Sequence, residues 1–181
     1  MTPVVHETVA LGDRAPSFLA LPAADGRAYA LDSFADRRYL AVIFIASGCP
    51  TVRAFEPRLN ALQEELRPSG FGLVAVNSND PALSPGDTLA EMGRRAAAGR
   101  YAFPYLKDAD GAVARAFGAV CTPHAFLLDA DRRIVYRGRV EDARNADRVT
   151  SRDLKEAVAD LVAGRPVRVA ETEPFGCSIV W

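Results

Sequence analysis

The stretch YLAVIFIASGCPTV, residues 39–52, joins a long apolar run to a cysteine and a proline. The run Tyr39–Ala46 is continuous and rich in strand-forming residues, which predicts a strand buried on both faces. A short Ser-Gly step interrupts the run, and Pro50 then takes the place that proline prefers in the first turn of a helix. The stretch therefore predicts a buried strand that turns directly into a helix, with Cys49 at the junction.

A helix and a second strand follow this junction. The segment Pro50–Leu66 predicts a helix, because apolar side chains recur along it at helical spacing, namely Phe55, Leu59, Leu62 and Leu66. Pro68 and Gly70 end this helix, and the apolar run Phe71–Val76 predicts the next strand. Because a strand, a helix and a strand occur in this order, we expect a parallel pair with a right-handed crossover.

The rest of the chain supplies short elements. The Asp25-Gly26 step predicts the tight turn of a hairpin within residues 11–38. The other predicted elements are helices at Thr88–Ala98, Gly111–Phe117 and Thr150–Ala163 and strands at Phe103–Leu106, Ala125–Asp129 and Arg133–Arg137. Thr150 and Asp153 resemble a capping box at the start of the last helix. This order predicts an α/β fold with a mixed central sheet, helices on both faces, an N-terminal β-hairpin extension and an inserted helix.

The size and charge of the chain limit the number of domains and the kinds of partner that we expect. The 181 residues fit a single domain, 1–181, and 49% of them are apolar. We expect residues 1–10 to be a flexible N-terminus and residues 165–181 to be a tail that packs on the domain. Basic and acidic residues nearly cancel, 22 against 23, which argues against nucleic-acid and membrane partners. The chain opens without a signal-peptide pattern, and no apolar run is long enough to span a bilayer, so we expect a cytoplasmic protein.

The cysteines are the candidate reactive groups. Cys49, Cys121 and Cys177 are too few and too far apart for a disulfide scaffold. A Cys49 thiolate at the start of a helix would face unpaired N–H groups and the positive end of the helix dipole. Both favour the anion, so the pKa of Cys49 should fall and its reactivity should rise. The alternative is a buried, inert cysteine, but the flanking Ser-Gly and Pro-Thr steps are typical of a loop.

Four features of the chain resemble the thioredoxin superfamily, in particular its redoxin and peroxiredoxin-like branch. They are GDRAPSF with DGRAYALDSF (12–18 and 25–34), FIASGCP (44–50), Pro57 eight residues after Cys49, and CTPHAFLLD (121–129). The resemblance spans most of residues 11–163 and implies a thioredoxin-like fold with a cis-proline at Pro123. In that fold the cis-proline loop lies beside the active cysteine and can pair with an extended substrate. The resemblance therefore implies substrate contacts for Pro50, Thr51, Thr122 and Pro123.

The chain also departs from the motifs of these relatives. The thioredoxin Cys-x-x-Cys motif is Cys49-Pro50-Thr51-Val52 here, so a valine replaces the usual second cysteine. Peroxiredoxins place their peroxide-attacking cysteine at the position of Val52, with a threonine and a proline where this chain has Cys49 and Ile45. The buried aspartate of thioredoxins is Ile43 here. The pattern resembles peroxiredoxin-like proteins that keep only the first cysteine, and their activity does not follow from the fold.

Cys121 and Cys177 are the candidate resolving thiols. Cys121 lies two residues before Pro123, and the resemblance places it near Cys49. Cys121 is either a thiol that resolves the oxidised Cys49 or a spectator on the loop. If an internal disulfide forms, Cys121 is the first choice as the partner of Cys49. Cys177 belongs to the apolar end of the tail, EPFGCSIVW, which either brings this thiol to the other two or docks with an idle thiol.

Two other groups of polar residues are interpreted as structural. His124 can tune a thiolate or bind a metal, but a strand histidine with a satisfied hydrogen bond is the preferred interpretation. Asn77, Asn79 and Asp80 follow the second strand, and ordinary turn chemistry explains them.

These observations predict an enzyme, a thiol-dependent oxidoreductase of the redoxin, antioxidant or disulfide-exchange type, with no cofactor. The Cys49 thiolate would attack a protein or small-molecule disulfide, or a peroxide, and an external thiol would serve as reductant. Disulfide exchange is preferred because the peroxiredoxin motif is absent. One alternative is a soft-metal module that holds Cu(I) through Cys49, Cys121 and Cys177, although no two of them have close ligand spacing and we expect no metal. The other alternative is a non-catalytic thioredoxin-like binding domain.

Overall fold

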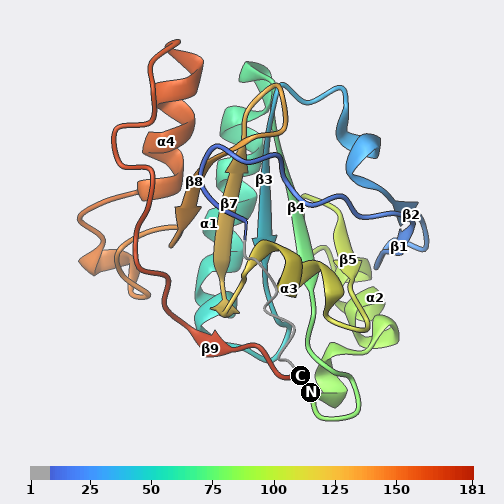
Figure 1. Ribbon diagram of the computed structural model, residues 1–181. Coiled ribbons are helices and arrows are strands. Elements are labelled where there is room, and N and C mark those ends of the chain that lie inside the picture. The colour runs from blue at the N-terminus through green and yellow to red at the C-terminus, as the bar shows by residue number, and fades with distance from the viewer. Residues whose placement is uncertain (1–8) are drawn as a thin grey trace, which may run out of the picture.

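A five-stranded mixed sheet forms the centre of the structure, a computed structural model that describes residues 9–181 (Figure 1). The strand order is β5-β4-β3-β7-β8. These strands span Tyr39–Phe44 (β3), Phe71–Asn77 (β4), Tyr105–Lys107 (β5), His124–Leu128 (β7) and Ile134–Gly138 (β8). β3 is parallel to β4 and antiparallel to β7, so the predicted parallel pair is confirmed.

Helices cover both faces of this sheet. On one face lie α1 (Pro50–Leu66), α2 (Leu89–Ala97) and α4 (Asp153–Val162), and on the other lie α3 (Ala112–Phe117) and the segment before β3. Successive β3 residues point to opposite faces, with Ile43 in the core beneath α1 and Val42 in the core beneath α3. Both faces are therefore buried, as the continuous apolar run predicts, and the predicted α/β class with helices on both sides is confirmed.

The two predicted additions to the sheet are present. The N-terminal hairpin pairs β1 (Leu21–Pro22) with β2 (Ala28–Tyr29), and Gly26 in its turn has φ 82°, a left-handed conformation that favours glycine. The inserted helix is α2, which lies between β4 and β5 in the chain. Of the N-terminus expected to be flexible, residues 1–8 lie outside the described part of the chain.

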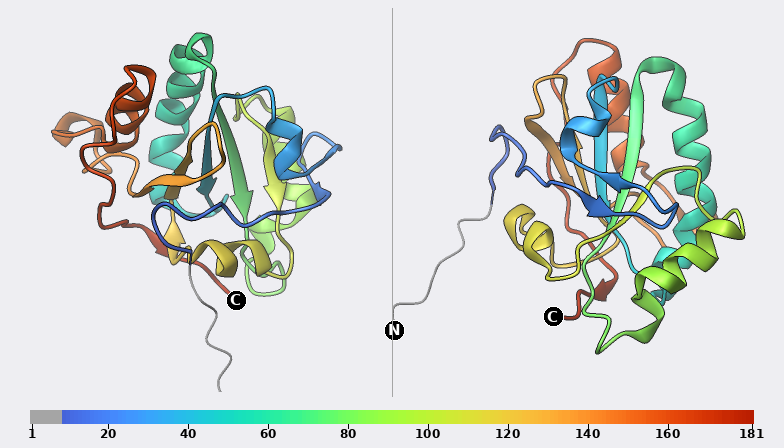
Figure 2. Two further views of the ribbon diagram at one scale, coloured as in Figure 1. Left: turned by 45° about the horizontal axis from the view of Figure 1, so that its top comes forward. Right: turned by 90° about the vertical axis from the view of Figure 1, so that its right-hand side faces the viewer.

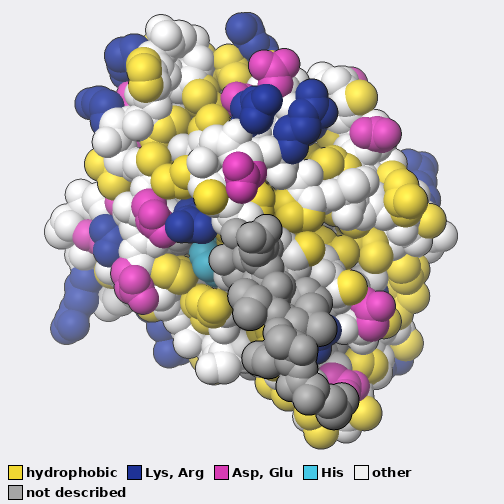
Figure 3. Space-filling view, viewed as in Figure 1, with side chains coloured by type: hydrophobic (Ala, Val, Ile, Leu, Met, Phe, Trp, Pro, Cys, Tyr) yellow, Lys and Arg dark blue, Asp and Glu magenta, His cyan; other side chains and the backbone are white. Residues whose placement is uncertain are grey.

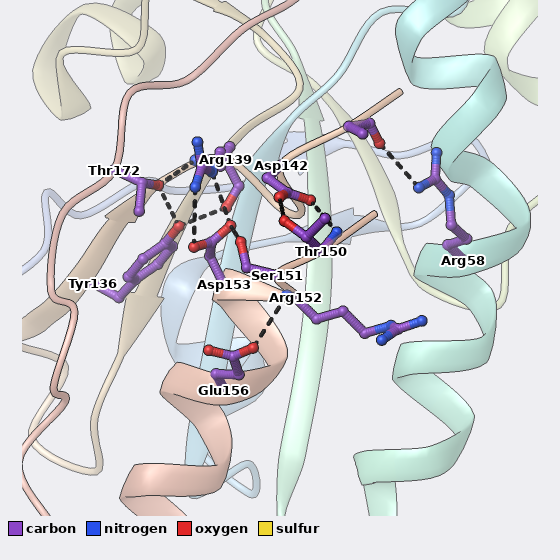
Figure 4. A network of polar contacts seen from close by, with 11 residues as sticks. Arg58, Tyr136, Arg139, Asp142, Thr150, Ser151, Arg152, Asp153, Glu156 and Thr172 are labelled. Atoms are coloured by element: carbon purple, nitrogen blue, oxygen red, sulfur yellow. Dashed lines mark hydrogen bonds and ion pairs between the residues drawn. The ribbon is translucent and has the colours of Figure 1, made fainter. Parts of the chain in front are cut away.

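The capping box predicted at the start of α4 is wrong. The helix begins at Asp153 and no side chain caps it. Thr150 instead donates hydrogen bonds from its N–H and its hydroxyl to the Asp142 carboxylate, and Asp153 forms an ion pair with Arg139 at 2.8 Å (Figure 4). Each residue of the predicted pair therefore has a tertiary partner, and together these contacts hold the loop between β8 and α4.

The C-terminal tail returns from α4 past β8 to the end of the molecule where α1 begins (Figure 2). Midway, the Thr172 hydroxyl accepts a hydrogen bond from the Arg139 N–H at 3.0 Å. Further on, the Phe175 ring lies 6.3 Å from the Phe55 ring of α1, measured between centroids. The tail ends in β9 (Cys177–Ser178), which pairs antiparallel with the short strand β6 (Cys121–Thr122).

Charged side chains of both signs are interspersed on the face of the molecule drawn in Figure 3. Within residues 9–181, no helix combines the length and the apolar character that a bilayer span requires.

Candidate active site

Cys49 lies at the turn from β3 into α1. It is the residue just before the first helical position, which Pro50 occupies, and its backbone is extended, with φ −74° and ψ 118°. The side chain is only 3% exposed, whereas the neighbouring Gly48 and Pro50 are exposed. The Cys49 sulfur therefore lies at the N-terminus of α1, with a small part of its surface open to solvent.

The segment that precedes Pro123 lies directly against this cysteine. The Thr122–Pro123 peptide bond is cis, and both residues are buried. The Cys49 thiol donates a hydrogen bond to the Thr122 carbonyl oxygen at 3.3 Å. Two segments that are more than seventy residues apart in the chain are thereby joined at the sulfur.

The tail brings Cys177 to the same place. In the β6–β9 pair, Cys177 lies opposite Thr122, and Ser178 lies opposite Cys121. The Thr122 hydroxyl donates to the Cys177 carbonyl oxygen at 3.4 Å. The Cys177 thiol is near enough to favour the ionised form of Cys49 and to lower its pKa. The three cysteines are free thiols, and these contacts make Cys177 the partner of Cys49 on the tail.

The three thiols differ in acidity. Burial raises the pKa of Cys49, but the neighbouring Cys177 thiol, the Val52 N–H and Thr122 favour the thiolate, outweigh burial and leave the pKa below its ordinary value. In the neutral state the Cys49 side chain makes no capping hydrogen bond at this helix end. Burial and the neighbouring Cys49 raise the pKa of Cys177 to about 11. Cys49 is therefore the thiol poised to ionise, and Cys177 keeps its proton.

Cys121 lies beside these two residues but makes a different contact. Its thiol donates to the Pro123 carbonyl oxygen at 3.9 Å. Burial, followed by the nearby charges of Cys49 and Cys177, raises the pKa of Cys121 to about 11. Cys121 is therefore a neighbour of the other two thiols and remains protonated at neutral pH.

Of the four residues expected to contact substrate, Pro50 and Thr51 follow Cys49 in the chain, and Thr122 and Pro123 form the segment that its thiol contacts. Pro50 is exposed at the start of α1, and the Thr51 side chain is buried behind it. Thr122 and Pro123 are covered in part by the tail, because β9 lies along β6.

A buried polar network, which the sequence analysis missed, supports the loop that leads to Cys49. Its centre is Asp87, which is fully buried and whose carboxylate accepts the Ser47 N–H at 2.7 Å. The same carboxylate accepts hydrogen bonds from three side chains, those of Asn77, Asn79 and Ser84. Burial raises the pKa of Asp87, and these hydrogen bonds outweigh it, so the pKa is lowered and Asp87 is held as a carboxylate.

The network continues to the tail. The Lys107 ammonium donates to the Asn77 side-chain oxygen at 3.1 Å and to the Asn79 carbonyl at 2.6 Å, and burial lowers its pKa. The Asn79 side-chain oxygen accepts the Val180 N–H at 2.9 Å. One cluster therefore fixes both the turn before Cys49 and the end of the tail. The only signal in the sequence is the group of polar residues after the second apolar strand, Asn77, Asn79 and Asp80, which ordinary turn chemistry also explains.

His124 has the role of a structural strand residue. Its Nδ1 accepts the Val120 N–H at 3.3 Å, and burial together with the Arg137 charge lowers its pKa to about 4. Across residues 9–181, no three His, Cys, Asp or Glu side chains are arranged to hold a metal ion. The soft-metal alternative therefore finds no ligand set in the described structure.

Known proteins share both the sequence pattern and the fold. The Redoxin family model matches residues 10–158. The hypothetical protein SMc02350 from Sinorhizobium meliloti 1021 is 41% identical and has a TM-score of 0.88, with 97% of this chain and 96% of that chain covered. An uncharacterized conserved protein from Geobacillus kaustophilus is 35% identical and has a TM-score of 0.89, with 97% and 94% covered.

A more distant structure shows the fold alone. The peroxidoxin BcpB from Mycobacterium tuberculosis is 20% identical, with 85% of this chain and 94% of that chain covered and a TM-score of 0.60. No curated protein matches the chain in sequence.

Proposed function

This chain belongs to the redoxin family, and from that membership we propose that it is a thiol-dependent oxidoreductase whose nucleophile is the Cys49 thiolate. The observation that carries the proposal is the position of Cys49, which directly precedes α1 and whose thiol donates to the carbonyl just before the cis Pro123. Cys49 has a lowered pKa at the start of α1, whereas Cys121 and Cys177 have pKa values near 11. The thiolate is the reactive form of cysteine, so Cys49 is the thiol that attacks first.

The first step depends on the oxidant. With a disulfide, the Cys49 sulfur attacks one sulfur of the substrate, the substrate S–S bond breaks, and a thiolate leaves a mixed disulfide on Cys49. With a peroxide, the sulfur takes one oxygen, the O–O bond breaks, and protonation releases an alcohol or water and leaves a sulfenic acid. We favour the disulfide, because the threonine of the peroxiredoxin motif is replaced by Cys49 itself.

Cys177 is the proposed resolving thiol. Its sulfur attacks the oxidised Cys49, the Cys49–Cys177 bond forms, and the Cys177 proton leaves with the second thiol or with water. Two points favour Cys177 over Cys121: it lies opposite the residue whose carbonyl accepts the Cys49 thiol, and its thiol lowers the pKa of Cys49. Val52 stands where a thioredoxin has its second cysteine, so the partner must come from another segment. An external thiol then reduces the disulfide, a requirement that suits a reducing compartment such as the cytoplasm.

Counting released thiolates tests the proposal. The symmetrical disulfide of thionitrobenzoate releases one coloured thiolate when Cys49 attacks it and a second when Cys177 resolves the mixed disulfide. We expect a rapid release of two per chain from the wild type and of one from Cys177→Ser, which should retain the mixed disulfide by mass spectrometry. Cys49→Ser should lose the rapid phase. A rapid phase that survives in Cys49→Ser would show that another thiol is the nucleophile.

A further inference from the structure

The tail lies along β6 as a bound peptide would. Its backbone is held from both sides: the Ile179 N–H donates to the Val120 carbonyl at 3.4 Å, and the Asp80 N–H donates to the Val180 carbonyl at 2.7 Å. The Thr122 hydroxyl also donates to the Cys177 carbonyl. These bonds use the main chain of the tail, so they do not depend on its side chains. A strand added to an edge is recognised in this way in many peptide complexes.

The side chains of this segment divide into buried and free positions. Phe175 lies against Phe55 of α1, and Ile179 is only 6% exposed in the core beneath α3. Ser178, between them, is exposed. Cys177 lies opposite Thr122, whose carbonyl oxygen accepts the Cys49 thiol, and this is the place that the reacting sulfur of a substrate must take. The segment therefore has two apolar anchors around one reacting sulfur.

Gly176 is the position at which the groove is most restrictive. A Cβ atom added there would lie 2.0 Å from the Thr122 carbonyl oxygen and 2.7 Å from the Thr122 carbonyl carbon. The residue also has φ 150°, which side chains rarely adopt. Because the obstacle is backbone, it cannot move aside without breaking the β6–β9 pair. A chain that follows this path therefore needs glycine immediately before its cysteine.

We propose that the groove between β6 and the Asn79–Asp80 turn is a binding site for an extended protein segment carrying Gly-Cys, and that Phe175–Ile179 is a tethered copy of that ligand. This inference rests on the proposed role of Cys49 as nucleophile. The partner is a protein disulfide whose cysteine follows a glycine, with an apolar residue at each end of the segment. Its cysteine takes the place of Cys177, and the tail leaves the groove while the partner is bound.

A tethered ligand competes strongly with a free one. Attachment to the domain gives the tail an effective concentration of about millimolar, so a partner of the same sequence enters the groove only part of the time. A change that weakens the tail but leaves the groove intact should therefore speed the reaction of an external peptide. A tail that only packs on the domain would give no such effect, and peptides would not be selected for glycine.

The test uses two peptides and the full chain with Cys177→Ser, which blocks internal resolution. The first peptide is TEPFGCSIVW, the sequence of residues 172–181, with its cysteine joined to thionitrobenzoate, and the second has alanine in place of glycine. Release of thionitrobenzoate, with mass spectrometry of the Cys49–peptide product, gives the two rates. We expect the glycine peptide to react at least about tenfold faster, because a clash with backbone costs on the order of that factor or more.

A second variant opens the groove. Adding Gly176→Ala to Cys177→Ser should displace the tail and raise the rate of the glycine peptide several-fold. Gly164→Ala is the matched control, because Gly164 also has positive φ but its added Cβ would meet no atom within 4 Å. It should leave the peptide rate unchanged. Equal rates for the two peptides would overturn the inference, and so would a glycine peptide rate that does not rise in the Gly176→Ala variant.

A small disulfide, 2-hydroxyethyl disulfide, separates the two proposals. If Cys49 reacts with it normally while the peptides react at equal rates, the groove assignment fails and the proposed function stands. If Cys49 reacts with neither the small disulfide nor the peptides, the proposed function fails, and the groove assignment falls with it.

Discussion

Thr122 and Cys177 lie opposite one another across the β6–β9 pair, and the carbonyl of the same threonine accepts the Cys49 thiol at 3.3 Å. This one residue therefore links the nucleophile at the start of α1 to the cysteine on the tail. The link uses the backbone of Thr122, and the Thr122 hydroxyl strengthens it by donating to the Cys177 carbonyl oxygen. What it requires is that the tail remains docked, so the chemistry of Cys49 and the position of the tail should be coupled.

The first prediction concerns the acidity of the thiols. At pH 7 a thiol with a pKa of about 11 is ionised in only about one molecule in ten thousand, so Cys121 and Cys177 should alkylate slowly in the folded protein. The lowered pKa of Cys49 should make it the fastest site, with a rate that begins to level off at a lower pH than that of the other two. Iodoacetamide labelling read by mass spectrometry at each cysteine measures this. The same labelling in concentrated urea is the control, in which the three rates should converge.

The second prediction concerns the partner of Cys49. Gentle oxidation followed by digestion without reduction should give a Cys49–Cys177 cross-link. The Cys121→Ser variant should give the same link. The Cys121 thiol contacts the Pro123 carbonyl oxygen, and the pairing of β6 with β9 uses only the backbone of residue 121. Cys177→Ser should stop at sulfenic acid or at a mixed disulfide with added thiol. A Cys49–Cys121 link in the wild type would instead assign resolution to the loop before Pro123.

Much of the fold could be predicted from the sequence because it depends on the pattern of apolar residues. The continuous runs of β3 and β4 and the periodic face of α1 each specify a buried element, and their order specifies a parallel pair. The prediction that failed concerns polar residues that have more than one possible hydrogen-bond partner. Thr150 and Asp153 satisfy the spacing of a capping box, yet each binds a side chain brought close by tertiary structure. Local spacing contains no information about such competitors.

The candidate site was predictable to a smaller extent. The residues around Cys49 identify it as a candidate nucleophile, because an apolar strand precedes it and a proline follows it. No sequence pattern identifies the Asp87 network, because its members come from separate segments and only the fold brings them together. The pairing of β9 with β6 is likewise hidden, because two-residue strands joined by main-chain bonds leave little pattern in the side chains. The one trace in the sequence is Gly176, and its meaning depends on the Thr122 carbonyl beside it.

The third prediction concerns Asp87. Replacing it by alanine leaves the Ser47 N–H, two buried side chains (Asn77 and Asn79) and the half-buried Ser84 hydroxyl without their acceptor, so the free energy of unfolding at pH 7 should fall by about 3 kcal/mol. The pKa of Asp87 is lowered by folding, so its contribution is complete above the ordinary value of 3.8 and is lost as the pH falls through the folded pKa. The unfolding free energies of wild type and variant, measured with urea, should therefore differ most at neutral pH and converge as the pH falls below the folded pKa of Asp87.

Asp36→Ala is the control for that prediction. The Asp36 side chain is 70% exposed and reaches Arg37 only at 3.7 Å, so its removal should change the unfolding free energy by less than about 0.5 kcal/mol. A comparable loss in both variants would mean that the Asp87 network contributes nothing specific to stability.

The fourth prediction uses Trp181, the only tryptophan, as a reporter of the end of the tail. The guanidinium carbon of Arg115 lies 4.4 Å from the centroid of the Trp181 ring, and a Cβ atom added at Gly111 would come within 2.7 Å of the same ring. Gly111→Ala should therefore push the ring into water, which shifts its fluorescence to the red and makes it easier to quench with acrylamide. Cys177 is held separately by β6, so this variant should still release two thionitrobenzoate thiolates per chain.

Gly176→Ala should shift the emission too but lose the rapid second release, because it separates Cys177 from Cys49. If Gly111→Ala abolishes the second release, then the last residues of the tail, and not the β6–β9 pair, hold Cys177 at the site.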